Sequence, residues 1–455
     1  MKVAFVWNSR AASWRSNSIM ETLSQLKGGR LLGARRVDLS CGLKEFPREI
    51  LNLADSLEVL NLSGNQLADL PDDFQRLAKL RILFCSENDF RHVPSVLGKC
   101  GNLEMIAFKS NRIETVPEDS LPPSVRWLIL TDNRISKLPK SIGRCQPLQK
   151  LMLAGNRLES LPVELGSCEN LELIRLAANR LEAFPEWLLR LPRLSWLAFA
   201  GNPMAAAPQA ADSRVLEWSR LELLDQLGEG ASGVIHGAKL QGEGGVEEDV
   251  AVKLFKGAMT SDGLPACEMA ACLAAGEHRN LIQVLGKISD HPERQEGLVM
   301  KRISGEFANL ADPPSLQSCT RDVYKQGFRL SNQVAIRIAV SIASVATSLH
   351  GRGILHGDLY AHNILWKSDG ECLLGDFGAA SFYSSLSPEF GKQLERVEVR
   401  AFGCLLEELL DRCASDISPQ LRRLQMRCVS EDSEGRPSFA EILAELQTSK
   451  SEVTD

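Results

Sequence analysis

Leucines recur at a fixed spacing through the first half of the chain, with polar residues between them. The unit is L-x-x-L-x-L-x-x-N-x-L-x-x-L-P, and one copy runs from Leu57 to Pro71. The first position of each copy follows the previous one by 22 or 23 residues, at Leu57, Leu80, Leu103, Val125, Leu148, Leu171 and Leu194. Such a period predicts a solenoid, in which every copy forms one structural unit stacked on its neighbours.

Each L-x-L in this pattern predicts a short strand whose leucines point inward, because alternate residues of a strand face the same side. The asparagine, for example Asn65, predicts side-chain hydrogen bonds to the backbone at the turn that follows the strand. One unit cannot bury its apolar face alone, so neighbouring units must stack. The pattern resembles the leucine-rich repeat family over residues 30–205, with about eight repeats, which implies an α/β solenoid of horseshoe form.

Bulky side chains occupy the variable strand positions that face outward on the concave side. They are Phe84, Trp127, Ile129, Met152 and Trp196. Exposed apolar surface on a solenoid usually marks an interface. We therefore expect a protein partner, or the second half of this chain, to dock on this face. The alternative is that these side chains only cover neighbouring strands.

A glycine-rich turn opens the second half of the chain. Residues 224–235 predict a strand, a turn containing Gly228, Gly230 and Gly233, and a second strand. Glycines let backbone amides approach phosphate groups closely. Similar turns occur in dinucleotide-binding folds, where a helix follows. Here an apolar strand follows instead and reaches Lys253, which is placed to bridge phosphate oxygens, and Glu268 on the next amphipathic segment can pair with it.

Farther along the chain, two polar clusters bring together the groups that phosphoryl transfer requires. His356-Gly357-Asp358 is followed by Asn363, and Asp376 begins an Asp-Phe-Gly triplet. One carboxylate can orient a hydroxyl nucleophile, whereas the amide and the second carboxylate can hold magnesium against a nucleotide triphosphate.

With these motifs in order, residues 221–446 resemble the eukaryotic-type protein kinase family, with features of tyrosine-kinase-like kinases. The resemblance implies a two-lobed α+β domain that uses ATP and Mg²⁺, with Mn²⁺ as an alternative metal. It implies that Asp358 is the catalytic base, that Asn363 and Asp376 are metal ligands, and that His356 is structural and not a base. The glycines would cover ATP, and Lys253, held by Glu268, would bind its phosphates. The resemblance also assigns an adenine-facing set, which is Ile235, Ala251, Met300, Ile303 and Leu365.

The end of the predicted activation segment also resembles the kinase pattern. Ser387-Pro388-Glu389 matches the end of that segment, and Glu398 matches a residue that opens a helix. Arg436 occupies the position of an arginine that is expected to pair with Glu389.

Departures from the kinase pattern concern regulation and substrate. Gly357 stands where an arginine commonly binds a phosphorylated activation loop, and the segment from Asp376 to Glu389 is short. We therefore predict that activity does not require phosphorylation of this segment. Tyr360 replaces a lysine common in serine/threonine kinases, and His362 stands where tyrosine kinases carry arginine.

Bulk properties narrow the remaining classes. The chain has 455 residues, 44% of them hydrophobic and 24% charged, which is globular composition with room for several domains. A formal net charge of -6 gives no support for nucleic-acid binding. The cysteines form no Cys-x-x-Cys pair and are interpreted as buried thiols in a reducing compartment. No apolar run is long enough to span a bilayer, so we expect a cytoplasmic protein with no membrane span.

The predicted organisation has five parts. Residues 1–29 are an N-terminal cap or flexible segment, 30–205 the repeats, 206–219 a linker, 220–448 the kinase-like domain and 449–455 a tail. The favoured function is transfer of the ATP γ-phosphate to a protein hydroxyl, of serine or threonine, with the repeats as a protein-binding or autoregulatory surface. Two alternatives stay open, a small-molecule phosphotransferase of kinase fold and a non-enzymatic scaffold that senses nucleotide.

Overall fold

The structure is a computed structural model that describes residues 22–205, 214–230, 232–242, 245–256, 259–260 and 262–452. The described residues divide into two compact units, and the division falls between Leu191 and Pro192. We call them the N-terminal unit and the C-terminal unit. Most of the segment predicted as an N-terminal cap or flexible segment, the first part of the predicted linker and the end of the predicted tail lie outside the described residues.

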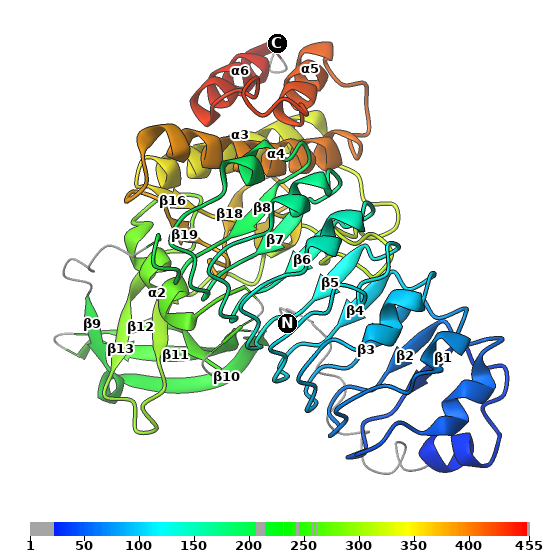
Figure 1. Cartoon of the computed structure of the whole chain (residues 1–455). Coiled ribbons are helices and arrows are strands. Elements are labelled where there is room, and N and C mark those ends of the chain that lie inside the picture. The colour runs from blue at the N-terminus through cyan, green and yellow to red at the C-terminus, as the bar shows by residue number, and fades with distance from the viewer. Residues whose placement is uncertain are drawn as a thin grey trace. The chain divides into compact units, whose positions relative to one another are not determined.

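The N-terminal unit contains seven short strands that follow one another in parallel register. They are β1 (Arg36–Asp38), β2 (Val59–Asn61), β3 (Ile82–Phe84), β4 (Met105–Ala107), β5 (Trp127–Ile129), β6 (Lys150–Met152) and β7 (Leu173–Arg175). Figure 1 shows them side by side, with short helices on the return path of the chain. This arrangement confirms the predicted repeat solenoid.

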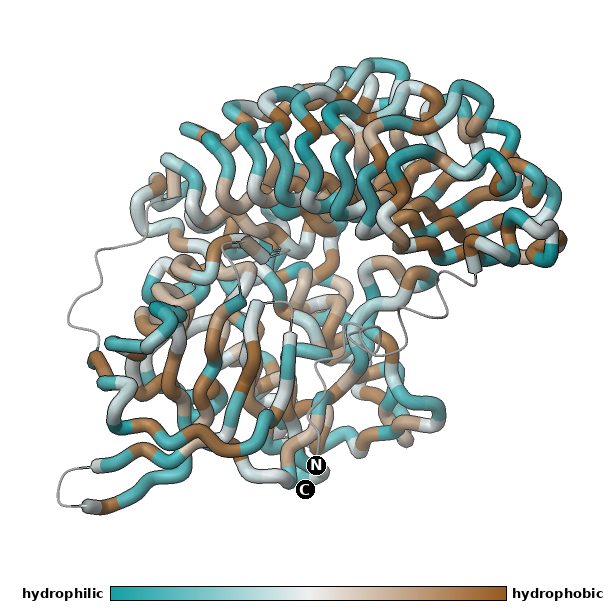
Figure 2. Tube along the Cα trace, turned by 90° about the horizontal axis from the view of Figure 1, so that it is seen from below, coloured by the Kyte–Doolittle hydropathy of each residue, from teal (hydrophilic) through white to brown (hydrophobic). Residues whose placement is uncertain are grey.

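Short 3-10 helices carry the chain back from one strand to the next. They are η1 (Arg48–Leu53), η2 (Phe74–Arg76), η3 (Ser95–Lys99), η4 (Lys140–Arg144), η5 (Val163–Ser167) and η6 (Glu186–Arg190). A proline precedes five of the six, where its fixed φ suits the first turn and its missing N–H costs no hydrogen bond. In Figure 2 hydrophobic stretches alternate with hydrophilic ones in successive repeats.

The repeat asparagines tie neighbouring repeats together. Asn156 is buried, and its Nδ2 donates to the carbonyl oxygens of Leu153 at 3.0 Å and Leu130 at 2.9 Å. Its Oδ1 accepts from the Ile135 amide at 3.0 Å. The predicted role of this asparagine is therefore confirmed, and each such residue satisfies backbone groups that burial would otherwise leave unpaired.

The C-terminal unit begins with the strand of the last repeat, β8 (Trp196–Ala198). After it comes a six-stranded sheet in the order β10, β11, β12, β14, β13, β9. Its strands are β9 (Val215–Glu217), β10 (Leu221–Glu229), β11 (Gly233–Gln241), β12 (Glu247–Phe255), β13 (Val284–Ser289) and β14 (Gly297–Lys301). All neighbours are antiparallel except β13 and β9.

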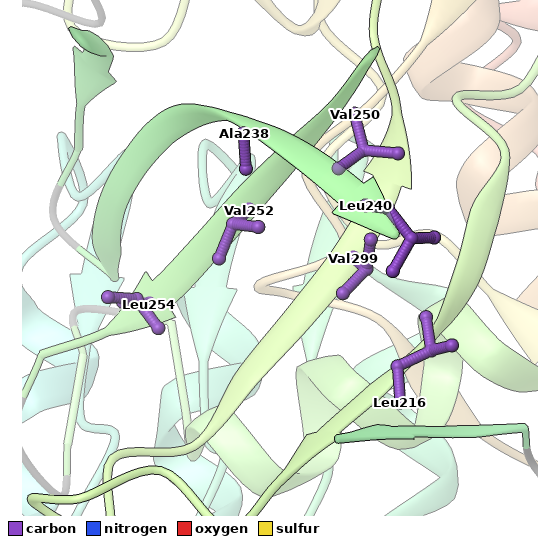
Figure 3. Packing of buried hydrophobic residues seen from close by; sticks show 7 residues of the cluster. All are labelled: Leu216, Ala238, Leu240, Val250, Val252, Leu254 and Val299. Atoms are coloured by element: carbon purple, nitrogen blue, oxygen red, sulfur yellow. The ribbon is translucent and has the colours of Figure 1, made fainter. Parts of the chain in front are cut away.

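The predicted linker extended to residue 219, but the chain already forms the strand β9 before that residue. Leu216 on β9 is 1% exposed and packs into the hydrophobic core of the sheet with Val250 and Val299. Figure 3 shows these side chains converging from β9, β12 and β14. The 3-10 helix η7 (Trp218–Arg220) then leads into β10. The burial of Leu216 stabilises β9 in the sheet. The sequence of this short strand did not predict that it belongs there.

Helices dominate the rest of the C-terminal unit. They are α2 (Pro265–Ala274) beside the sheet, then α3 (Asn332–His350), α4 (Pro388–Leu410), α5 (Pro419–Cys428) and α6 (Phe439–Glu452). Figure 1 shows α3 and α4 side by side, with α5 and α6 beyond them. A sheet domain followed by a helical one confirms the predicted two-lobed α+β architecture.

One helix of the described residues, α3, has the length and hydropathy of a membrane span, although no apolar run was expected to reach that length. Half of its most apolar stretch is buried inside the protein. It packs against α4 and α6 as a core helix. A buried core helix meets the same test of length and composition, so α3 is weak evidence for a membrane segment.

Short strands frame the loops between the large helices. β15 (Ala308–Asn309), β17 (Ile364–Trp366) and β18 (Cys372–Leu374) form one small sheet, and β16 (Ile354–Leu355) pairs with β19 (Ser381–Phe382). The 3-10 helix η9 (Ala361–Asn363) lies between β16 and β17. These pairings fix both ends of the loops that carry Asp358 and Asp376.

Candidate active site

The glycine-rich turn connects β10 and β11, as predicted. The Gly230 amide donates to the Gly233 carbonyl oxygen at 2.9 Å, which closes the turn. A Cβ on Gly233 would lie 2.5 Å from the Leu254 carbonyl oxygen, so only glycine fits there. Gly228 lies at a register shift of β10, and Ala231 is outside the described residues.

Residues assigned to the adenine region lie on adjacent strands and on the segments near them. Ala251 on β12 pairs with Met300 on β14, and Ile235 on β11 pairs with Lys253 on β12. Ile303 follows β14, and Leu365 lies on β17 of a separate small sheet. Ile235 therefore lies beside Lys253 on the neighbouring strand, and Met300 lies beside Ala251.

Lys253 and Glu268 form a buried ion pair between β12 and α2. Burial opposes the charge on Lys253, but the carboxylates of Glu268 and Asp376 outweigh it and hold the pKa of the ammonium above its ordinary value. Burial raises the pKa of Glu268, against the effect of Lys253. Lys253 is therefore held as a fixed cation close to Asp376.

The carboxylate of Asp358 is held by Asn363, five residues later. Asn363 Nδ2 donates to the Asp358 carbonyl oxygen and to its Oδ2, both at 2.9 Å. The 3-10 turn η9 brings the two residues together, because it folds the chain back between them. The pair forms one unit in which the orientation of the carboxylate is fixed by the amide.

His356 is fully buried and bridges the two acidic motifs. Its Nε2 lies 3.0 Å from the Gly375 carbonyl oxygen, and the Asp358 amide donates to its Nδ1 at 3.3 Å. The second bond makes Nδ1 an acceptor, so Nε2 carries the proton. Its ring contacts Phe377 with centroids 5.1 Å apart. These contacts agree with the structural role predicted for His356.

The residues proposed as metal ligands offer oxygen atoms of the right kind. Asn363 Oδ1 is buried and has no hydrogen-bond partner among the described residues. Asp376 has a left-handed backbone with φ 55°, and its Oδ1 accepts from the Gly378 amide at 3.1 Å. An amide oxygen and a carboxylate are the hard donors that Mg²⁺ prefers. Asn363 and Asp376 therefore fit a magnesium ion held against a nucleotide.

Glu398 ties the loop of Asp358 to two helices. Its Oε1 accepts from the Gly357 amide at 2.7 Å, and its Oε2 lies 2.7 Å from His350 Nε2 on α3. The prediction that Glu398 opens a helix was wrong, because α4 begins at Pro388 and Glu398 lies in its interior. Ser387 caps this helix by accepting from the Phe390 amide at 3.3 Å.

The expected pairing of Arg436 with Glu389 was also wrong. Arg436 is 2% exposed and donates to the carbonyl oxygens of Ser430, Arg396 and Pro192. Burial, with the nearby Arg400 cation, lowers the pKa of Arg436 to about 10. Glu389 lies exposed in the first turn of α4, so the long helix keeps it in solvent.

Asp322 belongs to the site but could not be identified from the sequence. Its Oδ2 accepts from the His362 amide at 2.9 Å, and its Oδ1 lies 2.7 Å from His362 Nδ1. Burial acts to lower the pKa of His362, but the Asp322 carboxylate outweighs it, so this pKa lies above its ordinary value. Forty residues separate the two, and no motif surrounds Asp322.

The candidate interface residues of the repeats are less exposed than the sequence indicated. Trp127, Ile129, Met152 and Trp196 are all buried, and Phe84 is partly buried. The Lys150 ammonium lies 4.2 Å from the centre of the Trp127 ring. Trp196 belongs to the C-terminal unit and contacts the loop of Asp358, whereas the others lie on β3, β5 and β6.

Comparison with known families supports both the repeat solenoid and the kinase-like domain. Residues 221–400 match the model of the protein tyrosine and serine/threonine kinase family. Residues 123–181 and 146–204 match one leucine rich repeat model, and residues 56–77 match another. The chain combines leucine-rich repeats with a protein kinase domain.

Similar proteins include several kinases. A probable inactive serine/threonine-protein kinase, roco10 of Dictyostelium discoideum, is 32% identical over 145 residues, 30% of this chain and 5% of that protein. The dual specificity protein kinase pyk3 of the same organism is 26% identical over 241 residues, 44% of this chain and 17% of that protein. The mouse serine/threonine-protein kinase TNNI3K is 26% identical over 280 residues, 51% of this chain and 32% of that protein. The chain thus spans no more than about a third of the length of each of these relatives.

Proposed function

We propose that this protein is an ATP-dependent protein kinase that phosphorylates serine or threonine hydroxyls and uses Mg²⁺. The observation that carries the proposal is the buried Lys253–Glu268 pair beside Asp376, together with Asp358 held by Asn363. A protein that no longer catalyses phosphoryl transfer would have no need to keep a buried cation and three acidic or amide groups in this arrangement. Relatives named as serine/threonine kinases support the substrate class.

Each group has a distinct task in the proposed reaction. The amides of the glycine turn and the Lys253 cation receive the phosphates, and a magnesium ion held by Asn363 and Asp376 would neutralise their charge. Asp358 orients the acceptor hydroxyl and takes its proton as the hydroxyl oxygen bonds to the γ-phosphorus. The bond between the γ-phosphorus and the bridging oxygen breaks, and ADP leaves with the electron pair. Asn363 keeps the Asp358 carboxylate aimed at the hydroxyl.

A small-molecule phosphotransferase is the second candidate. It is favoured by Gly357 and by the short segment between Asp376 and Glu389, which leaves little chain to support a peptide. Against it stands the match of residues 221–400 to the protein kinase family.

The acceptor class can be tested with a substrate panel. Purified full-length protein with Mg-ATP should phosphorylate casein or a mixed peptide library, and mass spectrometry should locate the phosphate on serine or threonine. Aminoglycosides and choline, tested in parallel, should show no transfer above the hydrolysis background. Transfer to a small alcohol alone would replace the proposal with the second candidate, and phosphotyrosine alone would refute the serine/threonine assignment.

A further inference from the structure

The last repeat is built into the kinase domain. Residues 192–204, which we call the last-repeat segment, include β8 and belong to the C-terminal unit. Trp196 is 2% exposed, and its Nε1 donates to the Leu359 carbonyl oxygen at 3.1 Å. Its ring stacks on Tyr360, with centroids 4.3 Å apart and planes 8° from parallel. Trp196 thus contacts both residues that follow Asp358.

The same segment also binds the activation segment. The Phe199 amide donates to Ser381 Oγ at 2.9 Å, and Ser381 is fully buried. Ser385 Oγ donates to the Met204 carbonyl oxygen at 3.3 Å. Two serines that could have been phosphorylation sites are instead used to attach the activation segment to the last repeat.

Two arginines anchor the start of the segment to the helical lobe. Arg400 Nη1 on α4 donates to Ser195 Oγ at 2.7 Å, and Arg436 Nη2 donates to the Pro192 carbonyl oxygen at 2.9 Å. Hydrogen bonds from a charged donor are stronger than neutral ones, and more so where water is excluded. The segment is therefore held at both ends and in the middle.

Gly357 makes room for this segment. A Cβ at this position would lie 2.6 Å from the Leu197 carbonyl oxygen and 2.6 Å from that of Ala379. An arginine side chain of the kind that binds a phosphorylated loop cannot occupy the same space as β8. The absence of an arginine at position 357 is thus linked to the packing of β8 against this loop.

The catalytic groups are assembled while the segment is in place. Lys253 pairs with Glu268, and Asn363 holds the Asp358 carboxylate. We propose that the last-repeat segment is an internal brace, which positions the Asp358 loop and the activation segment and replaces activation by phosphorylation. Trp196 is the main positioning residue of this brace. The inference rests on the proposed kinase function and adds how that function is switched on.

Trp196→Ala in the full chain, after phosphatase treatment, tests the brace. The variant should lose about 10–100-fold in kcat, because a small misplacement of a catalytic group has effects of that order. Its affinity for Mg-ATP should stay unchanged, since the contacts of Trp196 within the described part of the chain are with Leu359 and Tyr360 and not with Lys253. Amides of residues 355–363 should exchange hydrogen faster. Trp196→Phe keeps an aromatic ring for stacking on Tyr360 but removes the hydrogen bond to Leu359, so its loss should be intermediate.

Trp187→Ala is the matched control, because Trp187 lies on η6 of the N-terminal unit. It should leave kcat and exchange of residues 355–363 as in the wild type. If Trp196→Ala does not fold, Ser381→Ala, which removes the acceptor of the Phe199 amide, gives the same test with a smaller change.

The possible results distinguish a failure of the brace proposal from a failure of the proposed kinase function. A rise in kcat on Trp196→Ala would show that the segment blocks the site, and an unchanged kcat would show that it only packs there. Either result overturns the brace. If the unmodified protein binds Mg-ATP but transfers no phosphate, the proposed function fails, and hydrogen exchange of residues 355–363 still decides whether Trp196 holds the loop.

Discussion

At the scale of single residues, Gly357 joins the sequence to the regulation of the protein. The absence of arginine at this position predicts that phosphorylation of the activation segment is not needed. The structure shows why this position requires glycine. The φ of Gly357 is 71°, in the left-handed region, and two carbonyl oxygens leave no room for a Cβ.

Gly357→Ala should therefore lower the free energy of unfolding by about 2–5 kcal/mol, from left-handed strain and overpacking together. Gly327→Ala is the matched control, since Gly327 has φ 76° and nothing within 4 Å of an added Cβ. It should cost only about 1–2 kcal/mol. Urea-induced unfolding of both variants measures the difference. Equal losses would mean that the close approach of Leu197 and Ala379 is not rigid.

The residues that carry chemistry could be predicted from sequence, because phosphoryl transfer requires particular side chains in a particular order. Lys253 and Glu268 form the predicted pair, and Asp358 and Asn363 are in contact. Their assignment as catalytic and metal-binding residues stays a prediction. Contacts set only by tertiary packing could not be predicted. Asp322 and its bond to His362 have no local pattern, and Arg436 bonds to carbonyl oxygens in place of Glu389.

At the scale of elements, the activation segment is the part that departs most from expectation. It ends in α4, a continuous helix from Pro388 to Leu410, whereas the sequence predicted a helix that opens at Glu398. The proline and the Ser387 cap start the helix early, and no proline interrupts it after Pro388. The short segment is tied to β8 by the bond between Phe199 and Ser381 and to β16 by its strand β19, whereas Ser384, Ser385 and Glu389 stay exposed.

The prediction that activity does not require phosphorylation of this segment can be tested at an exposed serine. Ser384 is exposed, so Ser384→Ala should change kcat by less than about twofold, within the usual effect of surface substitutions. Ser381 and Ser385 are hydrogen-bonded to the last-repeat segment, and Tyr383 donates to Glu395 Oε1 at 2.8 Å. Steady-state kinetics on phosphatase-treated protein provides the measurement. A large loss at Ser384 would reveal a phosphorylation requirement.

At the scale of the whole molecule, the repeats and the kinase domain do not divide where the sequence pattern changes. The repeat pattern continues to residue 205, but the compact C-terminal unit begins at Pro192. The spacing of the leucines identifies a repeat, but it does not indicate which part of the protein packs against the strand of that repeat. The contacts of Trp196 with Leu359 and Tyr360 decide that assignment for β8.

The proposed phosphoryl transfer depends on Asp358 as the base that takes the proton of the acceptor hydroxyl. The most direct test compares the full-length protein with Asp358→Asn, using radiolabelled ATP in a single-turnover transfer assay and calorimetry for Mg-ATP binding. Asp358→Asn should lower transfer at least about 1000-fold and retain nucleotide affinity, because the general base acts in the transition state more than in binding. Equal transfer by both proteins, or no transfer by either, would contradict it.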